Sequence, residues 1–127
     1  MKTSLFKVLI VDDEIDICYL LSGILQQKDF KTAYANSLSE ATIALQKDTP
    51  DIIFLDNHLP DGLGIDYIRH VKEVCPLTCV IMITAHDSMI EKNKALNNGA
   101  DAFLGKPLTR DLIYTSIQKF IVPRPML

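Results

Sequence analysis

The sequence predicts a single α/β domain in which helices cover both faces of a parallel β-sheet. Short β-branched apolar runs alternate with longer stretches whose apolar residues recur at helical spacing, and several of the short runs are apolar throughout. The 127 residues, 48% hydrophobic and 23% charged, suit one folded domain of ordinary size. We therefore assign residues 1–127 to one domain, with a core over about residues 7–120 and a frayed tail over residues 121–127.

Five apolar runs predict the strands, and a helical pattern follows each of them. The strands are expected at residues 8–11, 32–35, 52–55, 80–83 and 102–104. The helices are expected at residues 15–25, 38–45, 65–71, 89–96 and 112–120, the fourth being the weakest because it has few large apolar residues. Ser37 and Thr109 are the expected N-caps, and Asn98-Gly99 is typical of a helix end.

This alternation, with short connections and right-handed crossovers, predicts a flavodoxin-like, doubly wound (βα)5 domain with strand order 2-1-3-4-5. Ligands of such sheets bind beyond the carboxyl ends of the strands, in the crevice between the first and third strands. Those ends carry reactive side chains: Asp12 and Asp13 follow the first strand, Asp56 the third, Thr84 the fourth and Lys106 the fifth. We expect these residues to form one site.

Three carboxylates in one crevice repel one another, by roughly 4 kcal/mol for a pair 4 Å apart at an effective dielectric of 20. Lys106 offsets part of this repulsion, and oxygen ligands favour Mg²⁺ or Mn²⁺ over zinc. With the Thr84 hydroxyl as a donor, the set suits transfer of a phosphoryl group to a nucleophile. Asp56 is the expected nucleophile because it projects alone from an apolar strand, whereas Asp12 and Asp13 are free to bind metal.

Four segments resemble the receiver domains of two-component response regulators in both order and spacing. They are VLIVDDE at residues 8–14, DNHLP at 56–60, ITA at 83–85 and GADAFLGKP at 99–107. The resemblance implies that Asp56 accepts a phosphoryl group from a histidine kinase or a phosphotransfer protein. It also implies a magnesium site formed by Asp12, Asp13, Asp56 and the backbone carbonyl of His58, and a cis Lys106-Pro107 bond.

The resemblance further implies a conformational switch that couples Thr84 to Phe103 and controls an output partner or domain. The output surface would be the fourth helix, the fifth strand and the fifth helix, which also implies a homodimer through these elements. Two simpler interpretations stay open, in which Thr84 is an ordinary helix N-cap and Phe103 is an ordinary core residue.

Other functional classes fit the residues less well. A phosphatase or phosphotransferase that forms an aspartyl phosphate usually has an acid/base Asp two residues after the nucleophile, where this chain has His58. A receiver that binds partners without phosphorylation would not need the acidic set, and a flavodoxin-like electron carrier would need a phosphate-binding loop after the first strand. We expect a signalling domain that assists its own phosphorylation and dephosphorylation, not an enzyme.

His58 and His86 also fall near the expected site, two residues after Asp56 and Thr84. Without a third nitrogen or thiolate ligand we do not expect zinc there, and we expect these side chains to affect access of water to an aspartyl phosphate.

Charge and hydropathy restrict the partners and the compartment. The net charge of -3 predicts no general attraction to nucleic acid, and no apolar run is long enough for a membrane span. The N-terminus does not resemble a signal peptide, so we expect a cytoplasmic protein with its three cysteines reduced. Such a chain is either a stand-alone protein or the receiver portion of a longer regulator.

Overall fold

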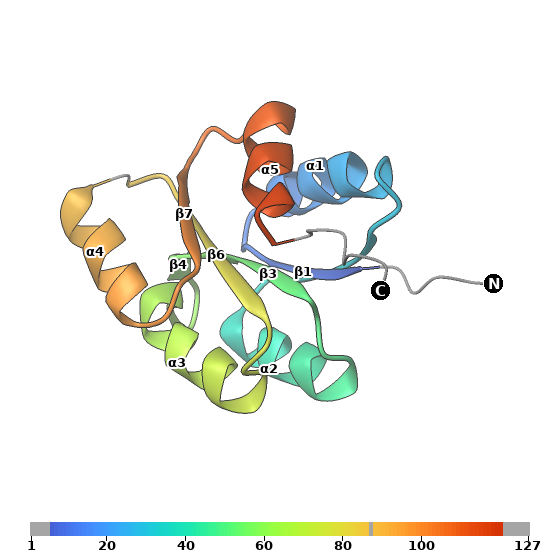
Figure 1. Cartoon of the computed structure of the whole chain (residues 1–127). Coiled ribbons are helices and arrows are strands. Elements are labelled where there is room, and N and C mark those ends of the chain that lie inside the picture. The colour runs from blue at the N-terminus through green and yellow to red at the C-terminus, as the bar shows by residue number, and fades with distance from the viewer. Residues whose placement is uncertain (1–5, 87, 121–127) are drawn as a thin grey trace, which may run out of the picture.

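The computed structural model describes residues 6–86 and 88–120, and the expected fold class is confirmed. Five parallel strands form one sheet in the order β2-β1-β3-β6-β7, which is the expected order when the short strands β4 and β5 are not counted (Figure 1). The five strands are β1 Lys7–Val11, β2 Lys31–Ala35, β3 Ile52–Asp56, β6 Cys79–Thr84 and β7 Ala102–Gly105. The expected tail at residues 121–127 lies outside the described residues.

The helices lie on both faces of the sheet, with α1 and α5 on one face and α2, α3 and α4 on the other (Figure 1). They are α1 Ile15–Gln26, α2 Leu38–Lys47, α3 Gly64–Val74, α4 Met89–Asn97 and α5 Arg110–Gln118. The expected N-caps are confirmed, because Ser37 Oγ accepts from the backbone N–H of Glu40 and Thr109 Oγ1 from that of Leu112. No helix in the described ranges is long and apolar enough to cross a membrane.

Alternate residues of the central strands point to opposite faces and form two hydrophobic cores. Phe54 of β3 packs in the core beneath α1 and α5, whereas its neighbour Leu55 packs in the core beneath α2, α3 and α4. Every residue of β3 is buried. The carboxyl end of β3, where Asp56 lies, is therefore held from both faces.

A two-stranded hairpin between β3 and α3 is an addition to the expected elements. Its strands are β4 His58–Leu59 and β5 Gly62–Leu63, which pair antiparallel. Two-residue strands are too short to produce a recognisable alternation of apolar and polar residues. The hairpin fixes the backbone immediately after Asp56.

Candidate functional site

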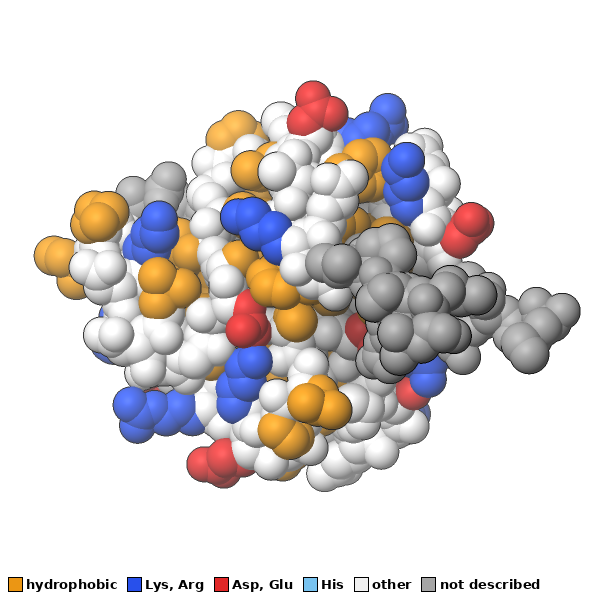
Figure 2. Space-filling view, viewed as in Figure 1, with side chains coloured by type: hydrophobic (Ala, Val, Ile, Leu, Met, Phe, Trp, Pro, Cys, Tyr) orange, Lys and Arg blue, Asp and Glu red, His pale blue; other side chains and the backbone are white. Residues whose placement is uncertain are grey.

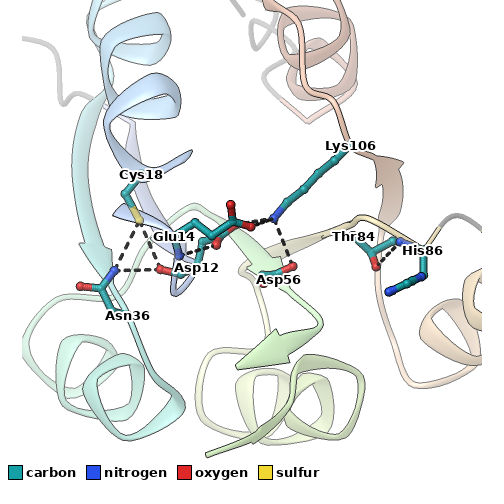
Figure 3. Close-up of polar contacts among 8 residues, drawn as sticks. All are labelled: Asp12, Glu14, Cys18, Asn36, Asp56, Thr84, His86 and Lys106. Atoms are coloured by element: carbon teal, nitrogen blue, oxygen red, sulfur yellow. Dashed lines mark hydrogen bonds and ion pairs between the residues drawn. The ribbon is translucent and has the colours of Figure 1, made fainter. Parts of the chain in front are cut away.

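Side chains from three separate strand ends meet at the carboxyl edge of the sheet (Figure 3). Asp12 follows β1, Asp56 ends β3 and Lys106 follows β7. One carboxylate oxygen from each of Asp12, Asp13 and Asp56 lies within 4.8 Å of the other two. The structure thus brings together the acidic residues that the strand ends predict.

The Lys106 ammonium lies among carboxylates from three positions in the chain. Its Nζ is 3.0 Å from Asp12 Oδ2, 3.3 Å from Glu14 Oε1 and 3.5 Å from Asp56 Oδ1, and its side chain is only 12% exposed. Glu14 is an addition to the expected set. These contacts place the positive charge of Lys106 where it reduces the repulsion among the carboxylates.

Burial makes this site costly for negative charge. Asp12 is fully buried and Asp56 is 5% exposed. Loss of solvation, reinforced by the neighbouring Asp12 carboxylate, raises the pKa of Asp56 to about 6 although Lys106 opposes the shift. Burial also raises the pKa of Asp12. For Lys106, burial lowers the pKa, but the pairs with Asp12, Asp56 and Glu14 outweigh it and the net shift is upward.

The oxygens of Asp12 show that the site suits a further cation. Asp12 Oδ1 accepts a hydrogen bond from the backbone N–H of Glu14 at 2.9 Å. The buried Oδ2 contacts the Lys106 ammonium at 3.0 Å. Lys106 is one cation shared among the carboxylates of Asp12, Asp56 and Glu14, so a hard divalent ion bound beside it would offset the remaining negative charge. The donor set therefore fits Mg²⁺ or Mn²⁺.

Thr84 lies at the end of β6 with 1% of its surface exposed. Its Oγ1 accepts from the backbone N–H of His86 at 3.1 Å, and its carbonyl accepts from the backbone N–H of Lys106 at 2.7 Å. The N-cap of α4 is Ser88, whose Oγ accepts from the backbone N–H of Glu91. The interpretation of Thr84 as a helix N-cap is therefore wrong.

Phe103 lies on β7 opposite Met82 of β6. Thr84 comes two residues after Met82, so the side chains of Phe103 and Thr84 lie on the same face of the sheet. Phe103 is half-buried and packs against the core beneath α2, α3 and α4. Its packing role is confirmed, and its role in a switch stays a prediction.

Asn57 supports the site and was not expected from the sequence. It is buried, its carbonyl accepts from the backbone N–H of Gly64 at 2.7 Å, and its side-chain Oδ1 accepts from that of Ile65 at 3.0 Å. These bonds satisfy the first turn of α3. The β4–β5 hairpin separates Asn57 from the start of α3 in the sequence. A search for capping residues directly before the helix therefore does not find Asn57.

The expectation of a cis Lys106-Pro107 peptide bond is confirmed. Cys18, Cys75 and Cys79 form no disulfide among the described residues.

Comparison with known proteins agrees with this geometry. Residues 8–118 match the response regulator receiver domain family. The chain is 38% identical over 116 residues to the response regulator protein PilR of Pseudomonas aeruginosa. The aligned segment makes up 88% of this chain and 26% of PilR. It is 32% identical over 105 residues to the phosphate regulon transcriptional regulatory protein PhoB of Escherichia coli, and the aligned segment makes up 81% of this chain and 46% of PhoB. The chain thus spans less than half the length of either relative.

Solved structures give the same result. A two-component response regulator from Clostridium difficile superposes with a TM-score of 0.88 at 28% identity, covering 91% of this chain and 95% of that one. The beryllofluoride-activated NtrC4 receiver domain dimer gives a TM-score of 0.85 at 36% identity, and the match covers 90% of this chain and 94% of the NtrC4 chain. The family match over nearly the whole described fold, together with the acidic site at the sheet edge, shows that this chain belongs to the receiver domains of two-component response regulators.

Proposed function

We propose that this receiver domain accepts a phosphoryl group on Asp56 from a histidine kinase or a phosphotransfer protein, and so controls an output partner or domain. The observation that carries the proposal is the convergence of three carboxylates within 4.8 Å, with Lys106 Nζ 3.5 Å from Asp56. Asp56 also ends a fully buried strand, so its position is held before any donor arrives.

In the proposed transfer, an Asp56 carboxylate oxygen attacks the phosphorus of a phosphohistidine. The phosphorus–nitrogen bond breaks and its electron pair leaves with the imidazole nitrogen. Lys106 would pair with one phosphoryl oxygen and the Thr84 hydroxyl would donate to another, which offsets charge that develops in the transition state.

The metal ligands on this proposal are Asp12, Asp13, Asp56 and the backbone carbonyl of His58. Mg²⁺ or Mn²⁺ bound there supplies positive charge next to the phosphoryl oxygens. Asp56 must be ionised to attack. Burial raises its pKa to about 6 in the metal-free chain, and a divalent ion bound to the carboxylate would lower that pKa. We therefore expect the pH at which phosphorylation is half-maximal to fall as the Mg²⁺ concentration is raised.

On this proposal the chain does not turn over a separate substrate. Lys106 and Thr84 assist phosphorylation of Asp56 in the same molecule, and the same groups assist its hydrolysis. The signalling output is the change of conformation that follows.

The direct test is labelling of the purified chain with phosphoramidate and Mg²⁺, read by intact mass. Wild type should gain one phosphoryl group, Asp56→Asn should gain none, and EDTA should prevent the gain. Asp66→Asn is the matched control, because Asp66 is exposed on α3 and should leave labelling unchanged. Undiminished labelling of Asp56→Asn would sink the proposal.

The proposed switch has its own test, because Thr84 and Phe103 lie on the same face of the sheet. Thr84→Ala should still be labelled, but the nuclear magnetic resonance signals of the Phe103 ring should no longer shift on labelling. Thr84→Ser keeps the hydroxyl and should keep most of the shift. A full shift in Thr84→Ala would show that the hydroxyl is not the coupling group.

A further inference from the structure

The imidazole rings of His58 and His86 form a pair near the acidic site. Their ring centres are 5.2 Å apart with the ring planes at 69°, and both residues are exposed. His58 belongs to β4, whereas His86 lies between β6 and α4. Two segments that are far apart in the sequence therefore bring two imidazole rings together.

The spacing of the rings fits coordination of one metal ion. With Zn–N distances of about 2.0–2.1 Å and a tetrahedral angle, two imidazoles on one ion have their ring centres about 5 Å apart. The observed separation of 5.2 Å agrees with that value. Exposure leaves room for water molecules to complete the coordination, so a third protein ligand is not required.

The surrounding charge also favours a cation. Asp56 lies two residues before His58, and its carboxylate belongs to the acidic cluster with Asp12 and Asp13. Lys106 opposes this negative charge but already pairs with Asp12, Asp56 and Glu14. The excess negative charge lowers the cost of bringing a divalent ion to the histidine pair.

We propose that His58 and His86 bind a transition metal ion of the class Ni²⁺ or Cu²⁺, at a site separate from the carboxylate site. Imidazole nitrogen suits these ions, whereas Mg²⁺ prefers oxygen ligands. Such an ion would tie β4 to the segment whose His86 backbone N–H donates to Thr84 Oγ1. Two protein ligands give a reversible site that responds to raised metal concentration.

The test is a calorimetric titration of the full chain with Ni²⁺ in excess Mg²⁺, which keeps the carboxylates occupied by a hard ion. Wild type should bind one Ni²⁺. His58→Asn and His86→Asn should each raise the dissociation constant at least tenfold, and His58→Asn keeps the backbone carbonyl. His70→Asn is the matched control, because His70 lies on α3 against Tyr67 and should leave binding unchanged.

A second measurement separates this site from the acidic one. In excess Mg²⁺, Ni²⁺ should raise the melting temperature of wild type and of Asp13→Asn, but not that of the double variant at His58 and His86. No binding by wild type, full binding by either histidine variant, or loss of binding in Asp13→Asn alone would overturn the proposal. Phosphorylation of Asp56 does not depend on the pair, so failure here leaves the proposed function untouched.

Discussion

Asp56 carries a negative charge that the fold stabilises poorly in the absence of metal. Burial and the nearby Asp12 carboxylate raise the pKa of Asp56 to about 6, compared with an ordinary value of 3.8. Between these two values the folded chain binds more protons at Asp56 than the unfolded chain does. The contribution of this group to stability is therefore fully present below about pH 4 and is lost as the pH rises through about 6.

Asp56→Asn should accordingly stabilise the metal-free protein at neutral pH, by about 1–3 kcal/mol. The gain should vanish near pH 4, where Asp56 of the wild type is protonated, and reach its full value above about pH 7. Urea unfolding in EDTA across this range measures it. A variant that is equally or less stable at neutral pH would contradict the repulsion among the carboxylates.

Lys106 offsets that repulsion through its pairs with Asp12 at 3.0 Å and Asp56 at 3.5 Å. Lys106→Met keeps a long side chain but leaves the buried carboxylates unpaired, so it should cost about 1–3 kcal/mol in EDTA. In the Asp56→Asn background the cost should be smaller, because one of the two buried partners is already neutral. Equal costs in both backgrounds would show that Lys106 acts through packing alone.

At the scale of elements, α3 begins directly against the strand that carries Asp56. A Cβ placed on Gly64 would lie 2.2 Å from the Asp56 carbonyl oxygen and 3.1 Å from Leu55 Cγ. The start of α3 therefore requires glycine for close approach, and Asn57 holds it there through two hydrogen bonds. The position of Asp56 depends on this contact between a helix and a strand.

Gly64→Ala should destabilise the fold by about 1–3 kcal/mol or more, because the added methyl group must displace the backbone of β3. It should also slow labelling of Asp56. Gly23→Ala is the control, since a Cβ there meets nothing within 4 Å. In the middle of α1 it should stabilise the fold by about 0.5–1 kcal/mol. Similar stability changes for the two variants would contradict the close approach at Gly64.

The α4 helix differs from the others in how little of it is buried. Ala95 is its only buried residue among those described, whereas α1 buries Cys18, Leu21, Ile24 and Leu25. Met89 and Ile90 of α4 are 68% and 81% exposed. Figure 2 shows hydrophobic side chains gathered over this part of the molecule, on the left of the view. Such weak attachment suits an element that moves or that packs against a partner.

At the scale of the whole molecule, we expect phosphorylation to promote a homodimer through α4, β7 and α5. Ile90→Glu places a charge in the exposed apolar surface and should keep the phosphorylated chain monomeric without reducing labelling of Asp56. Leu77→Glu is the control, because Leu77 is 94% exposed but lies outside these three elements. Light scattering before and after labelling measures the mass. A dimer that persists in Ile90→Glu would place the interface elsewhere.

Much of the fold follows from local patterns in the chain. Each strand of the main sheet begins and ends within one residue of its expected position, because β-branched runs and helical spacing alternate clearly. The sequence does not predict the short strands β4 and β5, because two residues are too few to show a period. Phe120 was expected in the last helix, but α5 ends at Gln118.

The sequence by itself determined that Asp12, Asp56 and Lys106 meet at the site, but not that Glu14 and Asn57 join them. Parallel strands with right-handed crossovers end at one edge of the sheet, so Asp12, Asp56 and Lys106 had to come together there. Only the tertiary structure decided how these groups behave. The raised pKa of Asp56, the ion pair between Asp12 and Lys106 and the contact between the two histidine rings depend on burial and on distances between remote segments. Desolvation and electrostatic energy are set by those distances, which local sequence patterns do not contain.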